Sequence, residues 1–226
     1  MTARRIPTLL FTFLAFALPT LAAKHPVLRE KDADCATCHE DKTKGKAVHS
    51  TAAMGCTTCH EVKTEKDVTT VNLVSPKEKL CFTCHEKSQD AVRHMPYEQG
   101  QCVLCHDPHT SDNPKLLRQP VVQLCFNCHE ANQPGVTVAA DKGEVTLPGN
   151  QSISLQMYDK APKLGLDRGG ASGHPITGHP FSGPDPRDKS RQITCMSCHQ
   201  PHSSKAQFLM PPDIKNDLDL CARCHQ

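Results

Sequence analysis

The chain has 226 residues with fourteen cysteines and fourteen histidines, yet it contains no tryptophan and two tyrosines. After residue 23, Leu, Ile, Val and Phe occupy 35 of 203 positions, about 17%, which is too few for a conventional side-chain core. The formal net charge is +2, so there is no basic excess that would indicate a nucleic-acid partner.

Residues 1–22 have the pattern of a secretory signal peptide. Arg4 and Arg5 precede an apolar stretch at 6–18, and Thr20-Leu21-Ala22 resembles a cleavage site for small residues. An uncleaved membrane anchor is the alternative, but the apolar stretch is shorter than the ~20 residues of a span. We therefore expect export to the periplasm or the outer surface, and a mature chain that is not integral to the membrane.

Seven C-x-x-C-H motifs follow and contain every cysteine of the chain. They are Cys35-Ala-Thr-Cys38-His39, Cys56-Thr-Thr-Cys59-His60, Cys81-Phe-Thr-Cys84-His85, Cys102-Val-Leu-Cys105-His106, Cys125-Phe-Asn-Cys128-His129, Cys195-Met-Ser-Cys198-His199 and Cys221-Ala-Arg-Cys224-His225. We expect each motif to begin or lie within a short helix, which puts both thiols and the histidine on one face. Residues 87–94 could extend the helix of the third motif.

A long segment without cysteine, 130–192, separates the fifth motif from the sixth. Residues 136–138 and 144–147 flank Asp141-Lys142-Gly143, which predicts a small β-hairpin over 136–147. A chain rich in proline and glycine then carries His174 and His179. The segment is either a loop insertion that supplies distal histidines or a docking element for a partner or the next protomer.

The C-x-x-C-H motif is the attachment sequence of c-type haem. Two thiols add to the two vinyl groups of one haem, and the adjacent histidine becomes the proximal ligand of the iron. Zinc sites and disulfide frameworks also use paired cysteines, but neither requires a histidine after the second cysteine. Seven such histidines, with no cysteine left over, favour seven covalent haems as the cofactors, and these would replace the missing side-chain core.

Seven further histidines equal the expected irons in number: His25, His49, His94, His109, His174, His179 and His202. If they fill the sixth positions, the irons are six-coordinate bis-His centres suited to electron transfer. The competing axial candidates are Met54, Met95, Met157, Met196 and Met210.

His109 and His202 each lie three residues after a motif histidine. Such a residue cannot easily reach the opposite face of the same haem, so we expect each to ligate a neighbouring haem. The alternative is that these histidines only pack at a haem edge.

Local context arranges the motifs as tandem pairs beginning at 35/56, 81/102 and 125/195, followed by a lone motif at 221. The predicted organisation is a signal peptide at 1–22, a four-haem region at 23–118 and a three-haem region at 119–226. The predicted fold is mainly irregular, with short α-helices wrapped around a stack of covalent haems.

These motifs resemble those of the bacterial multihaem c-type cytochromes with doubled C-x-x-C-H motifs, which are similar to cytochrome c3 and the cytochromes of metal-reducing bacteria. The resemblance rests on the Cys-His-Asp-Pro-His and Cys-His-Gln-Pro-His sequences at 105–109 and 198–202, and on Leu-Cys-Phe at 80–82 and 124–126. It is weaker over 24–79, because the second motif lacks the Pro-His sequence, and His25 could compensate there. The resemblance implies a loosely helical haem stack and electron transfer in anaerobic respiration, with metal reduction as one possibility.

We therefore expect a heptahaem electron carrier without catalytic residues, whose partners are other redox proteins. Two alternatives stay open. One is a multihaem reductase with one open-coordination haem. The other is a structural role as the protomer of a conducting filament or of an outer-membrane conduit.

Overall fold

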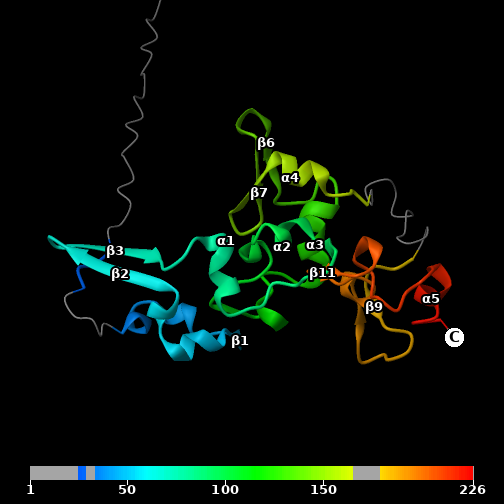
Figure 1. Ribbon diagram of the computed structural model, residues 1–226, viewed down its shortest axis with the longest axis horizontal. Coiled ribbons are helices and arrows are strands. Elements are labelled where there is room, and N and C mark those ends of the chain that lie inside the picture. The colour runs from blue at the N-terminus through cyan, green and yellow to red at the C-terminus, as the bar shows by residue number, and fades with distance from the viewer. Residues whose placement is uncertain (1–24, 29–33, 165–178, 226) are drawn as a thin grey trace, which may run out of the picture.

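Short helices and small antiparallel sheets, joined by irregular chain, make up the fold of the computed structural model. The structure describes residues 25–28, 34–164 and 179–225, so the predicted signal peptide and His174 lie outside the described residues. The chain advances from the β2–β3 hairpin at one end of an elongated molecule to α5 at the other (Figure 1). Within the described ranges, no helix is long and apolar enough to cross a membrane.

The helices are short, as the sequence predicts. They are α1 (Lys77–Leu80), α2 (Met95–Glu98), α3 (Val121–His129), α4 (Leu155–Lys160) and α5 (Asp217–Cys221). Single 3₁₀ turns cover Cys35–Thr37, Glu40–Lys42, Ser50–Met54, Cys56–Thr58, Cys81–Thr83, Cys102–Leu104, Pro114–Leu116, Ala140–Lys142, Cys195–Ser197 and Gln207–Leu209.

The expectation that each C-x-x-C-H motif lies in a helical turn is confirmed. Five motifs start a 3₁₀ turn at their first cysteine, the fifth motif lies in α3, and the seventh begins at the end of α5. In the first motif, the backbone N–H of His39 donates to the carbonyl of Cys35 at 2.8 Å. This turn brings the two cysteines and the histidine of one motif together.

The predicted helical extension over 87–94 is wrong. Residues 86–90 are irregular and β4 occupies Val92–Arg93. The reason is a long-range contact, because β4 pairs antiparallel with β11 (Ser203–Ser204), more than 100 residues away. The backbone hydrogen bonds of this pairing replace those of a local helix.

Two such strand pairs connect different repeats. β1 (Ala47–Val48), just before the second motif, pairs with β5 (Thr110–Ser111), just after the fourth. β4 lies just before the fourth motif and pairs with β11, which follows the sixth motif. This pair joins the second repeat to the third in the way that β1 and β5 join the first to the second. Each repeat is thereby joined to the next by a short ladder between segments that carry non-motif histidines.

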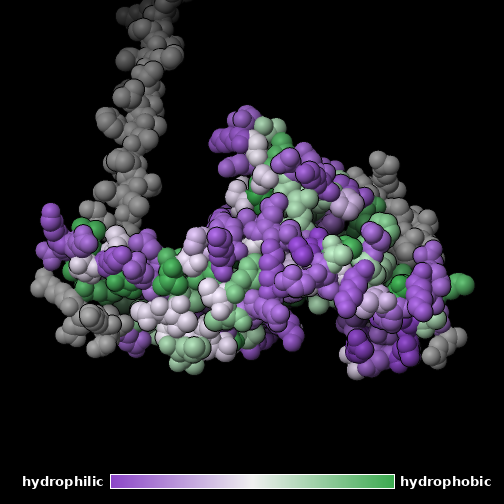
Figure 2. Space-filling view, viewed as in Figure 1, coloured by the Kyte–Doolittle hydropathy of each residue, from purple (hydrophilic) through white to green (hydrophobic). Residues whose placement is uncertain are grey.

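A longer hairpin follows the second motif. β2 (His60–Glu65) and β3 (Val68–Leu73) pair over six residues each, and Lys66 and Asp67 at the turn have φ of 48° and 62°. Positive φ at both central residues matches the twist of a two-residue hairpin. The hairpin occupies the place where the later repeats carry Pro-His. Apolar residues gather on its surface (Figure 2), including the exposed Val68, Val71 and Leu73.

The predicted hairpin over 136–147 is confirmed and is part of a larger unit. β6 (Thr137–Ala139), β7 (Glu144–Leu147) and β8 (Gln151–Ser154) form an antiparallel sheet with β7 in the centre. Val145, Leu147, Ile153 and Tyr158 form its buried core with α4. The described chain thus has its main apolar side-chain cluster in the segment without cysteine, and Leu104 and Cys128 of the fourth and fifth motifs pack against it.

A second small hairpin precedes the sixth motif. β9 (Gly183–Pro184) pairs antiparallel with β10 (Gln192–Ile193). The loop between these strands carries Arg187 and Arg191 and forms one wall of a cleft described below.

Candidate functional site

Histidine rings of the motifs lie opposite histidine rings from outside the motifs. Six pairs have ring centroids 5.9 to 6.4 Å apart. They are His39 with His25, His60 with His109, His85 with His49, His106 with His202, His129 with His94, and His225 with His179. Each pair combines one motif histidine with one spare histidine, and no histidine occurs twice.

This separation fits a metal ion shared by the two rings. A metal–nitrogen bond of about 2.0 Å and about 1.2 Å from that nitrogen to the ring centre put two ligating imidazole centroids about 6.4 Å apart. Ordinary aromatic contacts span the same range of distances, so the distance alone does not decide. The one-to-one combination of motif and spare histidines is the arrangement that bis-His ligation of one iron per motif would require.

The hydrogen bonds of the rings leave the same nitrogen available. Seven histidines have Nδ1 within hydrogen-bonding distance of an oxygen: His25, His49, His94, His106, His129, His179 and His199. Six of these oxygens are backbone carbonyls, to which a protonated Nδ1 can donate. The neutral tautomer with Nδ1–H keeps the lone pair of Nε2 free for iron, as is usual for metal-bound histidine.

Two of the accepting carbonyls belong to strained turns. His106 Nδ1 lies 2.8 Å from the carbonyl oxygen of Lys115, and His199 Nδ1 lies 2.8 Å from that of Phe208. Lys115 and Phe208 have φ of 59° and 56°, a region that costs non-glycine residues roughly 1–2 kcal/mol. The same strained turn thus recurs nine residues after the motif histidine in two repeats, and each time it orients that histidine.

Burial favours the neutral form of three spare histidines. It lowers the pKa of His94, His109 and His202, and the facing motif histidine lowers each further. At His109 the nearby Asp107 carboxylate partly opposes this shift. A neutral imidazole is the form that binds a metal ion.

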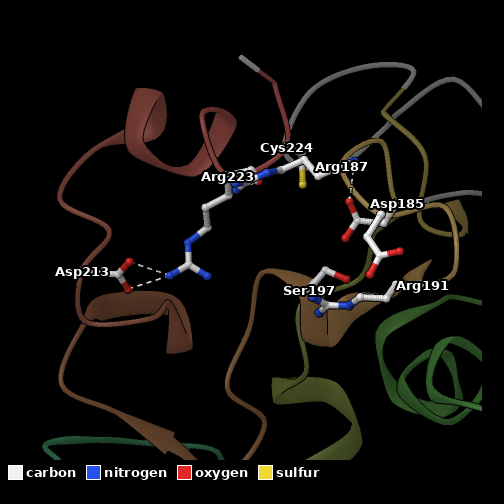
Figure 3. Close-up of a pocket in the computed structure, with 8 residues that line it drawn as sticks. Asp185, Arg187, Arg191, Ser197, Asp213, Arg223 and Cys224 are labelled. Atoms are coloured by element: carbon white, nitrogen blue, oxygen red, sulfur yellow. Dashed lines mark hydrogen bonds and ion pairs between the residues drawn. The ribbon is translucent and has the colours of Figure 1, made fainter.

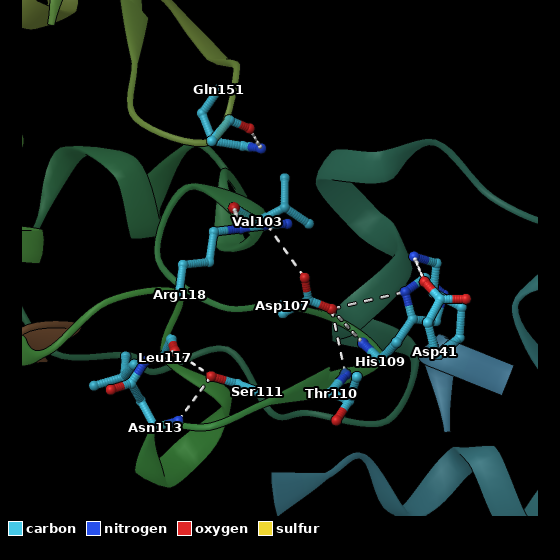
Figure 4. A network of polar contacts seen from close by, with 12 residues as sticks. Asp41, Val103, Asp107, His109, Thr110, Ser111, Asn113, Leu117, Arg118 and Gln151 are labelled. Atoms are coloured by element: carbon cyan, nitrogen blue, oxygen red, sulfur yellow. Dashed lines mark hydrogen bonds and ion pairs between the residues drawn. The ribbon is translucent and has the colours of Figure 1, made fainter. Parts of the chain in front are cut away.

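A polar network holds His109 in place (Figure 4). The Asp107 carboxylate accepts the backbone N–H of His109 at 3.0 Å and of Thr110 at 3.3 Å, and it forms an ion pair with Arg118 at 3.2 Å. Arg118 also donates to the carbonyl of Val103, inside the fourth motif. The segment after the motif is therefore fixed to the motif itself while its histidine faces His60.

Thiols of neighbouring motifs also come together. Cys56 lies close enough to Cys35 to affect its pKa, as Cys102 does to Cys81 and Cys195 to Cys125. These three contacts join the first cysteines of the three motif pairs that the sequence defines, 35/56, 81/102 and 125/195. The second cysteines lie near one another between pairs, since burial raises the pKa of Cys105 and Cys198 and the thiols of Cys128 and Cys224 raise these pKa values further.

The close thiols perturb one another. Burial, followed by the neighbouring Cys102, raises the pKa of Cys81 to about 11. The hydrogen bond from Cys125 lowers the pKa of Cys195 to about 7, while the same contact raises the pKa of Cys125. Thiols this near each other would hold their attached groups edge to edge.

A cleft of about 580 Å³ lies where the sixth and seventh motifs meet (Figure 3). Ser197 and Cys224 line it from the two attachment loops, and Arg187 and Arg191 come from the β9–β10 loop. One guanidinium nitrogen of Arg223, Nη2, donates to both carboxylate oxygens of Asp213 at 2.7 and 2.6 Å. The volume is in the range of small-molecule and cofactor sites, and the cysteine that lines the cleft is Cys224.

The described residues also bear on the alternatives to bis-His haem, which are zinc sites, disulfides and methionine ligands. All fourteen cysteines are free, and no described group of three or more His, Cys, Asp or Glu side chains is arranged to hold a metal ion by itself. Of the methionine candidates, Met54 and Met196 are exposed and Met157 packs against the core of the β6–β8 sheet. The C-x-x-C-H turns and the paired histidine rings have the residue types that would hold a covalent haem with two imidazole ligands.

Six motif histidines thus face six spare histidines, whereas His174 lies outside the described residues. His109 and His202 face histidines of other motifs, and their ligation of neighbouring haems stays a prediction. Sequence reasoning missed the residues that orient the rings, Lys115 and Phe208, because they act through backbone carbonyls. Their only sequence signal is the repeated interval from the motif.

The family model described as "Doubled CXXCH motif" matches residues 49–90, 94–134 and 188–226, more than half of the chain. The three matches correspond to the second and third, the fourth and fifth, and the sixth and seventh motifs, a grouping that differs from the predicted pairs 35/56, 81/102 and 125/195. No curated protein matches the chain.

Proposed function

Because this chain belongs to the family of multihaem c-type cytochromes with doubled C-x-x-C-H motifs, which bind haem covalently and transfer electrons, we propose that it is a heptahaem electron carrier. All seven motifs would attach haem through their cysteines and hold the iron with their histidines. When bound, each haem iron accepts and releases one electron by changing between the ferric and ferrous states.

The observation that carries this proposal is the set of six ring pairs. If both histidines of a pair ligate one iron, no coordination position stays open for a substrate, so the centre can exchange electrons but not bind a reactant. Nδ1 hydrogen bonds support the assignment, since they point the other ring nitrogen away from the protein acceptor. We assign His174 to the remaining motif histidine, His199, on the equality of the numbers.

The thiol contacts support a chain of centres in sequence order. Contacts between first cysteines alternate with contacts between second cysteines from the third motif to the seventh. The protein would thereby hold consecutive haems at close range and let electrons enter near one end of the molecule and leave near the other. Exposed apolar side chains such as Val71 and Leu73 would be covered by porphyrin faces.

The proposed cellular location rests on the N-terminal sequence. We place the mature chain in the periplasm or on the outer surface, after cleavage of residues 1–22, where covalent haem proteins can be matured. Its partners would be other redox proteins that dock weakly and transiently, and its role would be in anaerobic respiration, including metal reduction.

A coulometric titration of the purified holoprotein tests the proposal. A carrier with seven bis-His haems should take up seven electrons per chain and return them all, with an unchanged low-spin spectrum in both directions. An uptake of three electrons or fewer would contradict the heptahaem assignment. A high-spin haem that binds a reducible oxyanion and loses electrons to it would favour the reductase alternative.

A further inference from the structure

The N-terminal arm that carries His25 is attached to the rest of the described chain by one residue. The backbone N–H of Leu28 donates to the Thr69 hydroxyl at 2.9 Å, and the Thr64 hydroxyl donates to the carbonyl of Leu28 at 2.9 Å. Among the described residues, these are the hydrogen bonds that join 25–28 to other parts of the molecule.

The two threonines form a closed polar unit. They are direct cross-strand partners in the β2–β3 hairpin, and their hydroxyl oxygens are 2.8 Å apart. Thr64 uses its hydrogen on Leu28, so the Thr69 hydroxyl donates to Thr64, and every donor in the ring has an acceptor. Thr69 is 6% exposed, which means that its hydroxyl depends on these partners rather than on water.

The hairpin stands in a defined place relative to the first two motifs. β2 begins at His60, the motif histidine of the second motif, and the thiols of Cys35 and Cys56 lie together. The arm begins three residues before Leu28 at His25, whose ring faces His39 with centroids 6.2 Å apart. Side chains of the hairpin after the second motif thereby fix the backbone of the arm, and the arm places the His25 ring opposite His39 of the first motif.

We propose that Thr64 and Thr69 clamp the N-terminal arm and so hold His25 as the sixth ligand of the first haem. These are positioning residues, and the hairpin replaces the Pro-His segment that fixes spare histidines in the later repeats. This inference rests on the proposed bis-His ligation and adds to it that the first haem has the ligand most easily released. Opening of the arm would give a small diatomic ligand access to one ferrous haem.

Carbon monoxide binding to the reduced holoprotein tests the clamp. Thr64→Val and Thr69→Val together keep the shape of the side chains but remove both hydrogen bonds to Leu28. Two net hydrogen bonds correspond to an equilibrium change of about 5- to 150-fold, so half-saturation of one CO per chain should occur at a concentration lower by that factor. Thr70→Val is the matched control, because the Thr70 hydroxyl bonds to Lys63 within the same hairpin.

His25→Ala gives the highest CO affinity expected of the first haem, since it should leave that haem permanently open to CO. If His25→Ala opens one haem while the double variant behaves like Thr70→Val, the clamp is wrong and the ligand assignment stands. If His25→Ala creates no CO site, His25 is not a ligand and the inference is overturned, although the remaining six haems are untouched by that result. Should the double variant not mature, Thr69→Val alone must increase the CO affinity and Thr69→Ser must restore it.

Discussion

Seven histidine rings in this protein are oriented by a hydrogen bond at Nδ1 as well as by their place in the chain. His94 is a representative case, with Nδ1 3.0 Å from the carbonyl of Pro201 and its ring centroid 6.0 Å from that of His129. The carbonyl comes from the repeat that follows, so the ring is fixed from two sides. Which residue faces which histidine is therefore decided by contacts between repeats.

Removal of one spare histidine should change a single centre. In His94→Ala, the haem of the fifth motif loses its sixth ligand, and we expect one high-spin ferric haem per chain while the others stay low-spin. Met95→Ala is the matched control, because Met95 is the adjacent competing candidate and its loss should leave all haems low-spin. Electron paramagnetic resonance with spin quantification distinguishes the two, and a high-spin signal in Met95→Ala instead of His94→Ala would contradict the assignment.

The sequence predicts the residue types of the site well but not their combinations. All attachment cysteines and motif histidines follow from the C-x-x-C-H spacing, and the equal number of spare histidines predicts their use. The partner of each ring depends on strand pairs such as β4–β11, which no local pattern reveals. The carbonyl groups of Lys115 and Phe208 are equally invisible, because any residue supplies a carbonyl.

At the scale of the elements, close backbone approach brings consecutive motifs together. Gly100, just before the fourth motif, has φ of 68°, and a Cβ there would lie 2.1 Å from the carbonyl oxygen of Glu78 in α1. α1 leads directly into the third motif, so this contact sets the spacing of the pair whose thiols meet at Cys81 and Cys102.

Gly100→Ala should therefore destabilise the protein strongly. Gly143 provides a matched control, because its φ is 64° and no atom lies within 4 Å of the position that a Cβ would take there. We expect a loss of roughly 1–2 kcal/mol in Gly143→Ala from the backbone conformation alone. Overpacking adds roughly 1–3 kcal/mol in Gly100→Ala. Equal losses of unfolding free energy in the two variants would contradict the tight packing of α1 on this turn.

The β6–β8 sheet is expected to owe its stability to side chains rather than to haem. Leu147, 4% exposed, lies in its core, whereas Val138 of the same sheet is 49% exposed. Leu147→Ala should cost about 2–5 kcal/mol of local stability, and Val138→Ala less than about 0.5 kcal/mol. Hydrogen exchange of the sheet amides measures the loss, and the haem spectrum should stay the same. A spectral change in Leu147→Ala would show that the sheet supports the haem sites directly.

The elements also show where local sequence patterns fail. The β6–β7 hairpin is predictable, because Lys142-Gly143 separates two apolar stretches, but β2–β3 turns at Lys66-Asp67 without a glycine. The segment 87–94 has helix-forming residues and is nevertheless drawn into irregular chain and β4 by its pairing with β11. In both places contacts outside the segment decide the structure.

At the scale of the whole molecule, the composition and the structure lead to the same conclusion. A chain with few apolar residues builds one modest side-chain core, in the segment without cysteine, and arranges its other elements around paired histidines. The propionates of seven haems would make the holoprotein more acidic than the polypeptide, whose formal net charge is +2. The neighbouring thiols order the attachment sites along the molecule. The first sites lie near the β2–β3 hairpin and the last near α5 (Figure 1).

The number of covalent haems and the spin state of their irons test the central claim most directly. Intact-protein mass together with spin quantification of the oxidised holoprotein should give seven haems per chain, all low-spin. A colourless product that is compact and holds zinc or disulfides, or a chain with three haems or fewer, would contradict the account.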